Sequence, residues 1–118
     1  MRSLRSINRL ENERLECLGC EKVLGDEVRD TYRCPDCGDY VHIFAEDMQT
    51  GTRIVLLRKR STEVKVGDLV YLPGALTKDC NAVLAVNDRG SKVGLALKNY
   101  GEYRVPKEDG VNVRDGAW

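Results

Sequence analysis

The feature that most constrains this chain is a pair of Cys-x-x-Cys motifs in its amino-terminal half. The motifs are Cys17 with Cys20 and Cys34 with Cys37, and thirteen residues separate them. Two thiolates three positions apart on a tight loop can bind one metal ion, and two such loops facing each other complete the tetrahedral four-sulfur shell that zinc favours. The sequence therefore predicts one structural Zn²⁺ with all four cysteines as ligands.

The residues around the cysteines favour tight loops. Gly19 and Gly38 can adopt positive φ without steric cost, and Pro35 fixes φ at a value that suits a turn. Backbone amides can then point toward the sulfurs and stabilise their charge. We therefore expect each motif to form a compact metal-binding loop.

Other chemistry at the cysteines stays open. Disulfides or a redox-active dithiol are alternatives, although residues Met1 to Leu15 contain no uninterrupted apolar run. We therefore expect neither a signal peptide nor a membrane anchor and place the chain in the cytoplasm. The Cys-Pro-Asp-Cys-Gly segment at 34–38 also resembles a rubredoxin knuckle, and this resemblance implies iron as the competing metal.

Composition and charge indicate a compact protein without a strong overall electrostatic field. Of the 118 residues, 42% are hydrophobic and 32% are charged, which is too polar for a membrane protein and too apolar for a disordered chain. Nineteen basic side chains balance nineteen acidic ones, so any nucleic-acid site must be local. The chain has one histidine, no glycine-rich phosphate loop and no open position at the predicted metal, so we expect no enzymatic activity.

Three β-like runs accompany the cysteines, at 31–34, 40–45 and 52–57. The polar segment 46–51 ends in a glycine and can reverse an antiparallel pair, so the last two runs should form a hairpin. With the four cysteines, this arrangement resembles a zinc ribbon. The resemblance implies two loops that hold one zinc ion at the end of a three-stranded sheet, and it indicates little about function.

The carboxy-terminal part contains a dense series of short strand-like runs, at 66–72, 81–86, 92–98, 102–105 and 111–113. Four or five short, bent strands in about fifty residues are typical of a small barrel. The segments Val66-Gly67-Asp68-Leu69-Val70, Lys92-Val93-Gly94-Leu95-Ala96-Leu97 and Tyr103-Arg104-Val105-Pro106 resemble SH3-like barrels of the Tudor and KOW kind. Such barrels bind nucleic acid, modified peptides or protein domains, so the resemblance implies a fold and no particular ligand.

The chain is therefore predicted to be mainly β, with a three-stranded zinc ribbon followed by a small SH3-like β-barrel. The expected divisions are an amino-terminal segment at 1–12, the ribbon at 13–60, a linker at 61–63 and the barrel at 64–118. In the first segment, the spacing of Leu4, Ile7 and Leu10 permits a short helix leaning on the ribbon, with a frayed tail as the alternative.

Two groups of side chains are candidates for a binding surface. The basic group lies on the last ribbon strand and its exit, and the aromatic group lies in the barrel. They are Arg53, Arg58, Lys59 and Arg60, and Tyr71, Tyr100 and Tyr103. Basic side chains can contact phosphates, and tyrosine can stack on a base or a cation. A solvated charged face and ordinary barrel packing are the respective alternatives.

The functional hypothesis is a non-enzymatic zinc-binding adaptor. It would use a composite ribbon and barrel surface to bind nucleic acid or a protein of a nucleic-acid-processing machine, with neither a membrane nor a small-molecule substrate. A protein-interaction module or inhibitor that docks on a larger partner is the main alternative. Rubredoxin-like electron transfer is the third and requires iron.

His42 is expected on the ribbon surface, away from the metal, and Cys80 as a partly buried thiol.

Overall fold

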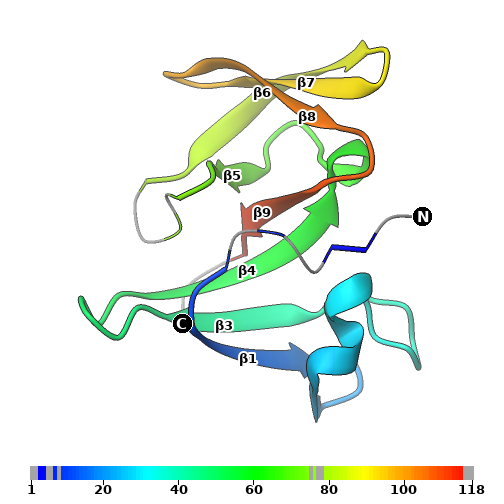
Figure 1. Cartoon of the computed structure of the whole chain (residues 1–118), viewed down its shortest axis with the longest axis vertical. Coiled ribbons are helices and arrows are strands. Elements are labelled where there is room, and N and C mark those ends of the chain that lie inside the picture. Colours follow the sequence, from blue (N-terminus) through cyan, green and yellow to red (C-terminus); the bar gives the residue numbers. More distant parts are fainter. Residues whose placement is uncertain (1–2, 5–6, 8, 75, 77–78, 116–118) are drawn as a thin grey trace.

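Segments rich in β-branched and aromatic residues form strands along most of the chain. The structure, a computed structural model, describes residues 3–4, 7, 9–74, 76 and 79–115. Within them, nine strands make one antiparallel sheet in the order β2-β1-β3-β4-β9-β5-β6-β7-β8 (Figure 1). The chain is mainly β, which confirms the fold class expected from the sequence.

The amino-terminal half contributes one side of this sheet. Its strands are β1 (Asn12–Cys17), β2 (Lys22–Leu24), β3 (His42–Glu46) and β4 (Arg53–Arg60), and a short 3₁₀ helix, η1 (Asp26–Asp30), follows β2. β3 pairs with β4, so the expected hairpin is confirmed. β1 lies beside β3, and β2 pairs with the other edge of β1.

The first strand of the ribbon is not the expected one. Segment 31–34 contributes a single bridge, between Arg33 and Tyr40, and β1 lies beside β3 in its place. The sequence of β1 is Asn-Glu-Arg-Leu-Glu-Cys, and its charged residues obscure the alternation that buries Leu15 and Cys17. The prediction was wrong here because a polar strand gives a weak hydrophobic pattern.

The carboxy-terminal half forms the other side of the sheet. Its strands are β5 (Leu69–Tyr71), β6 (Asn81–Arg89), β7 (Lys92–Leu97), β8 (Gly101–Pro106) and β9 (Gly110–Arg114), and each overlaps a run expected from the sequence. β6 pairs first with β5 and then with β7, and its register shifts between Val83 and Ala85. Such an irregularity bends a strand. The sheet is open at β8, which pairs with β7 alone among the described strands, and this does not conflict with the expected barrel.

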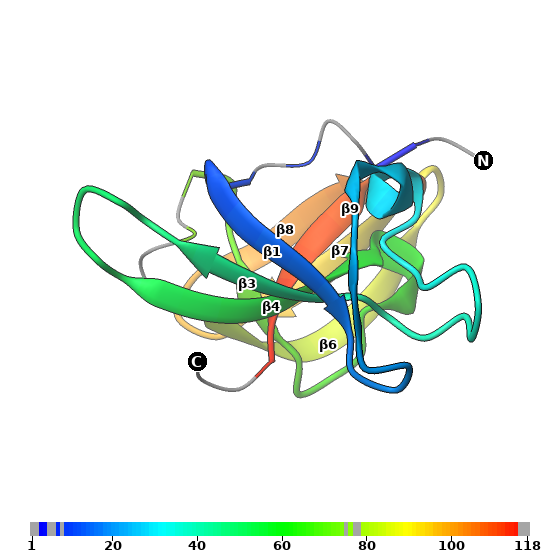
Figure 2. The same ribbon diagram turned by 90° about the horizontal axis from the view of Figure 1, so that it is seen from below.

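One strand joins the two halves. β4 pairs with β3 along one edge and with β9 along the other. Viewed from below, the ribbon strands lie in front of β6, β7 and β8 (Figure 2). The segment expected as a linker is a 3₁₀ helix, η2 (Ser61–Glu63), and Ser61 Oγ donates to the Pro106 carbonyl at 2.8 Å. The division at 61–63 stays a prediction, and the hydrogen bonds between β4 and β9 cross it.

Two apolar cores lie on opposite faces of the shared strands. The ribbon core includes Leu15, Tyr32, Ile43, Leu56 and Tyr71. The barrel core includes Val70, Val83, Leu95, Val105, Val111 and Val113. Because side chains alternate along a strand, β5 sends Val70 into one core and Tyr71 into the other. Both faces of the sheet are therefore covered where the halves meet.

The amino-terminal segment packs against the ribbon and β9. Where a short helix was expected, from Leu4 to Leu10, the described residues are not helical, and residues 5–6 and 8 of that stretch lie outside the described part. Leu4 is buried, and its amide donates to the Asp30 carbonyl at 2.9 Å. No helix in the described ranges is long and apolar enough to cross a membrane.

Candidate metal centre and binding surface

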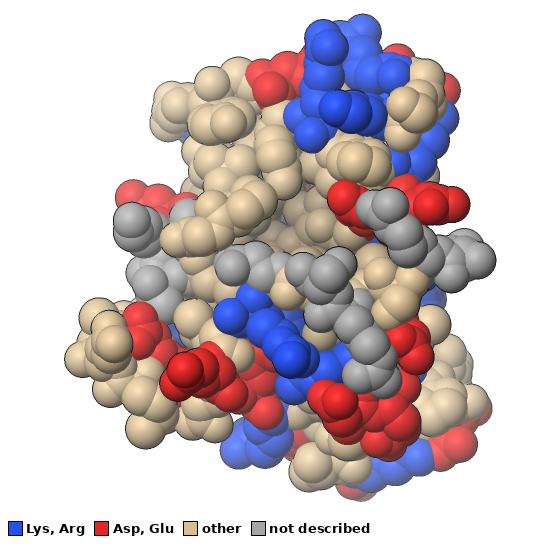
Figure 3. Space-filling view, in the orientation of Figure 1, with Lys and Arg blue, Asp and Glu red and all other residues tan. Residues whose placement is uncertain are grey.

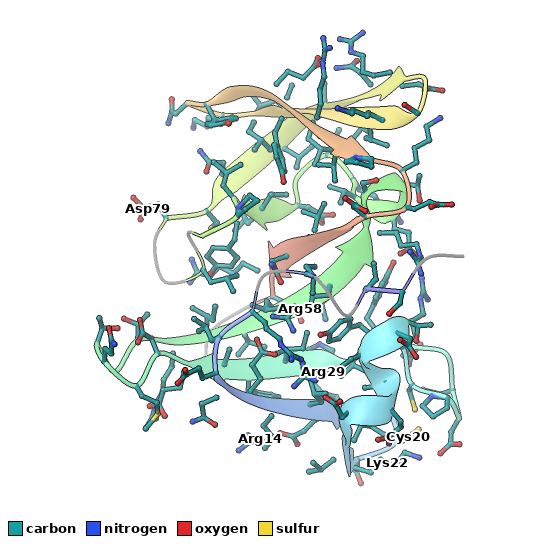
Figure 4. All side chains as sticks on the ribbon, viewed as in Figure 1. Arg14, Cys20, Lys22, Arg29, Arg58 and Asp79 are labelled. Carbon is teal, nitrogen blue, oxygen red and sulfur yellow. The ribbon has the colours of Figure 1, made fainter. Side chains whose placement is uncertain are left out.

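The sheet positions each pair of cysteines in a loop at one end of the ribbon. β1 ends at Cys17 and turns back into β2, so Cys20 lies in the connecting turn, next to Lys22 (Figure 4). Cys34 and Cys37 lie in a second loop, which the bridge between Arg33 and Tyr40 closes. The two loops can bind one metal ion together because the pairing of β1 with β3 sets them side by side.

The four sulfur atoms have the spacing of a tetrahedral metal site. They all lie within 4.8 Å of one another, with Cys17 and Cys37 Sγ 3.4 Å apart and Cys20 and Cys34 Sγ 3.9 Å apart. A tetrahedron with Zn–S bonds of about 2.3 Å has edges of about 3.8 Å. The four cysteines named from the sequence are thus brought together, close enough to bind one metal ion.

The four thiols do not ionise equally. Backbone hydrogen bonds from Cys37 and Asp36 lower the pKa of the Cys34 thiol to about 7. Hydrogen bonds with the sulfurs of Cys37 and Cys17 raise the pKa of Cys20 to about 12. Thiolates this close repel one another, so a bound cation is needed to hold all four in the ionised form.

Two glycines support the loops in different ways. Gly38 has a φ of +77°, in the left-handed region, as expected. In the first loop the left-handed residue is Glu21, with a φ of 53°, and not Gly19. A Cβ atom on Gly19 would lie 3.2 Å from Asp39 Oδ2. Gly19 therefore lies close to the Asp39 side chain of the second loop.

Arg58, expected on the binding surface, is buried in the molecule, and its side chain is 0% exposed. Its Nη1 and Nη2 donate to the Glu13 carboxylate at 2.8 and 2.6 Å, and its Nε donates to Asn112 Oδ1 at 2.7 Å. Its guanidinium also lies over the Tyr32 ring, 4.9 Å from the centroid. Figure 4 shows Arg58 and Arg29 inside the molecule near η1. Arg58 connects β1, β4 and β9 and is removed from the candidate surface.

Glu13 is the anion of this buried network. Its side chain is 1% exposed and also accepts a hydrogen bond from Arg29 Nη1 at 3.0 Å. Burial opposes its ionisation, but the hydrogen bonds and charge of Arg58 and Arg29 outweigh that effect and hold the pKa of Glu13 below its usual value. Sequence reasoning missed Glu13. The available signal was its alternation with Leu15 and Cys17, which places all three side chains on one face of β1.

The other three candidate cations do not form a continuous strip. The Arg60 side chain is largely buried and Nη1 donates to the Glu108 carbonyl at 2.8 Å. The largely buried Lys59 Nζ pairs with Asp68 at 3.1 Å. Arg53 is exposed, and its Nε donates to Glu46 at 3.0 Å. Of the four basic residues, Arg53 alone is well exposed.

The three candidate tyrosines also separate. Tyr71 is 4% exposed and belongs to the ribbon core. Tyr100 is 55% exposed at the turn between β7 and β8, and its ring meets that of half-buried Tyr103 edge to face, with centroids 6.5 Å apart. The aromatic surface is therefore a pair and not a cage of three.

The remaining two residues considered from the sequence lie outside the sulfur cluster. His42 is on β3, and its Nε2 is 2.7 Å from the Asp115 carboxylate. Cys80 is partly buried and packs against the ribbon core. Neither contributes to the four-sulfur site.

Comparisons with other proteins identify no family for this chain: no family model, curated protein or solved structure matches it. The fold and the site define a general class only. It is a mainly β chain with four clustered cysteines that can bind a metal ion.

Proposed function

We propose that this protein is a non-enzymatic adaptor, stabilised by one structural Zn²⁺, that binds nucleic acid or a component of a nucleic-acid-processing complex in the cytoplasm. The carrying observation is the cluster of four sulfurs with tetrahedral spacing. Four thiolates fill every position of a tetrahedral zinc ion, so the metal would hold the fold and perform no chemistry on a substrate. The binding function then falls to the surface away from the sulfurs.

The small size of the ribbon explains the need for a metal. Of the ten buried side chains in its core, three, Leu4, Tyr71 and Leu76, come from outside residues 13–60, so the ribbon itself supplies little apolar burial. Structural zinc supplies about 10 to 16 kcal/mol of apparent binding free energy in small peptide sites. Reducing conditions in the cytoplasm would keep the cysteines available for it.

Metal analysis of the purified protein tests the first half of the proposal. We expect one equivalent of zinc, no visible absorbance, and loss of the metal when Cys17 and Cys34 are both replaced by serine. A Cys80→Ser variant is the control, since Cys80 lies outside the cluster. Iron with strong visible absorbance would instead support rubredoxin-like electron transfer.

Basic side chains at one end of the molecule support the nucleic-acid part. Lys and Arg atoms gather over the end of the β6–β8 strands in the view of Figure 3, whereas basic and acidic atoms mix over the ribbon. A local basic surface on a neutral chain can bind phosphates without making the whole protein polycationic.

A titration with labelled single-stranded and duplex oligonucleotides tests this part. We expect binding at about 50 mM salt that weakens steeply by about 200 mM, because phosphate contacts release counterions. Absence of binding at the lower salt would reject the nucleic-acid function.

A protein-binding module is the second candidate, and exposed apolar side chains favour it. Leu18 at the first cysteine loop, and Val66 and Leu84 in the barrel, are all more than half exposed. The edge of β8 could also add a strand from a partner. Failure of the oligonucleotide titration would leave this as the better account.

A further inference from the structure

Strand register places several charged residues on one outward face of β6, β7 and β8. Arg89 is opposite Lys92, Asn87 is opposite Gly94, and Gly94 is opposite Arg104. The alternate residues of β7, Val93, Leu95 and Leu97, point into the barrel core. Because neighbouring residues in a strand face opposite ways, Arg89, Lys92, Glu102 and Arg104 share the outer side. We call these four residues the outer basic face.

A glycine in the middle of this face lies next to the carboxylate of Glu102. A Cβ atom on Gly94 would lie 2.7 Å from Glu102 Cδ, so a larger residue there would require the Glu102 side chain to move. Glu102 accepts two hydrogen bonds from Arg89, at 3.1 and 2.7 Å, and one from Arg104 Nε at 2.7 Å. These partners lower the pKa of Glu102 to about 2, first Arg89 and then Arg104, so the carboxylate is ionised at neutral pH. Glu102 thereby fixes two guanidinium groups side by side.

The face retains a positive charge after this pairing. Three cations, Arg89, Lys92 and Arg104, stand against the single carboxylate of Glu102, which gives a net charge of +2. The nearby Lys107 pairs with Asp88 at 3.1 Å and leaves that balance unchanged. The side chains remain accessible, with Arg89 43% and Arg104 62% exposed, and Lys92 is also exposed.

Guanidinium groups whose orientation is fixed by a neighbouring carboxylate are well suited to binding phosphates. Arg104 contacts Glu102 through its Nε, which directs the planar group while the side chain stays mostly in solvent. Arginine can offer paired N–H groups to two phosphate oxygens, and a fixed orientation reduces the entropy lost on binding. Neighbouring strands are about 4.8 Å apart, so cations on β6, β7 and β8 can contact consecutive parts of a charged backbone.

We propose that the outer basic face, through Arg89, Lys92 and Arg104, is the surface that binds the phosphate backbone of nucleic acid. This inference rests on the proposed nucleic-acid function and moves its site from β4, where Arg58 and Arg60 are buried, to the far side of the barrel. Contacts of this kind are made with phosphates and so carry little sequence specificity.

The test compares two double variants of the full-length, metal-loaded protein. Lys92→Ala with Arg104→Ala removes two cations of the face and leaves Arg89 as the partner of Glu102. Arg14→Ala with Lys65→Ala removes two exposed cations elsewhere and makes the same change in net charge. Binding to a labelled single strand of about 20 nucleotides is measured between about 50 and about 200 mM salt. Thermal unfolding verifies that each variant is folded.

Each phosphate contact to a single strand contributes about 0.7 to the salt slope. Removing two contacts should lower the slope by about 1.4, so the affinity lost over this fourfold salt range shrinks by about sevenfold. The Arg14 and Lys65 variant should keep the wild-type slope. The same slope in both variants, with wild-type binding intact, would overturn the inference and leave the nucleic-acid function standing.

Two further outcomes distinguish nucleic acid from an acidic protein as the ligand. Wild-type protein that binds no oligonucleotide would overturn the inference together with the nucleic-acid function. Polyglutamate that binds the face more tightly than the oligonucleotide would assign it to an acidic protein partner, which also overturns the inference. Weak binding of polyglutamate beside tight binding of the oligonucleotide supports it.

Discussion

Arg58 and Arg104 show that burial decides what a charged residue does in this protein. Arg58 is enclosed by Glu13, Tyr32 and Asn112, and its guanidinium hydrogen bonds link three separate segments of the chain. Arg104 is mostly exposed and meets one carboxylate through a single nitrogen. In the sequence, Arg58 directly follows the β-like run at 52–57, and Arg104 lies within the run at 102–105. The partners of Arg58 lie 26 to 54 residues away in the chain, which is why residue-level prediction failed for it, whereas the partner of Arg104 is Glu102, two residues away.

Replacement of Glu13 by glutamine should strongly destabilise the fold. The change leaves the guanidinium groups of Arg58 and Arg29 facing a neutral amide in a dry site, and breaking a buried ion pair costs about 3 to 5 kcal/mol. Glu46→Gln, at the exposed pair with Arg53, is the control and should change the free energy of unfolding by about 1 kcal/mol or less. Urea unfolding of both variants measures the difference.

The same comparison has a defined dependence on pH. The pKa of Glu13 in the folded protein is below its usual value of 4.5, so its ionised form favours folding. That stabilisation is complete above the usual pKa and is lost as the pH falls through the lowered one. The gap in unfolding free energy between wild type and Glu13→Gln should therefore be constant near neutral pH and shrink in acid. A gap that grows in acid would contradict the role assigned to Glu13.

At the scale of elements, prediction succeeded where a strand carries its own hydrophobic pattern. β3, β4 and β5 to β9 all overlap runs expected from the sequence, because alternating or β-branched residues mark them. β1 and β2 were missed. The inward face of β1 carries one partner of a buried ion pair, Glu13, and one of the four sulfurs, Cys17, beside a single apolar residue, Leu15, so its hydrophobic pattern is weak. The cysteine loops were predictable because their spacing alone reveals the chemistry.

A substitution at Gly110, at the start of β9, can test which contacts fix the amino-terminal segment in place. A Cβ atom there would lie 2.8 Å from Ile7 Cδ1 and 3.1 Å from Leu4 Cδ2. Gly110→Val should therefore displace this segment and cost about 1 to 3 kcal/mol, as overpacking does. Faster trypsin cleavage within residues 1–12 would report the displacement.

Leu4→Ala is the matched variant for that test. It removes a buried side chain from the same contact without altering β9, and should cost about 2 to 5 kcal/mol with similar exposure of the segment. Wild-type cleavage rates in both variants would show that the contact does not hold the segment in place.

For the whole molecule, the shared strand determines how far the loss of metal spreads. The sulfur loops lie at the end of β1 and before β3, while the barrel core is built mainly from β5 to β9 and includes none of the four cysteines. We expect metal removal to expose the amides of β1 to β3, to weaken protection along β4 and β9, and to leave β6 to β8 protected. Hydrogen exchange followed by two-dimensional NMR measures this.

Adding zinc back should restore the protection of the backbone amides of β1 to β3 against hydrogen exchange. Unchanged exchange in the ribbon after verified metal removal would show that the metal does not hold it. Complete loss of protection in β6 to β8 would show that the two halves unfold as one unit, and the division at 61–63 would then have no energetic meaning.

The position of β9 also bears on how the chain can fold during synthesis. β9, the last of the nine described strands in chain order, is the middle one in the sheet and lies between β4 and β5. Until it emerges from the ribosome, both of those strands keep an unpaired edge, and unpaired edges invite association with other chains. The observed pairing of β4 and β5 can therefore be completed only after β9 has been synthesised.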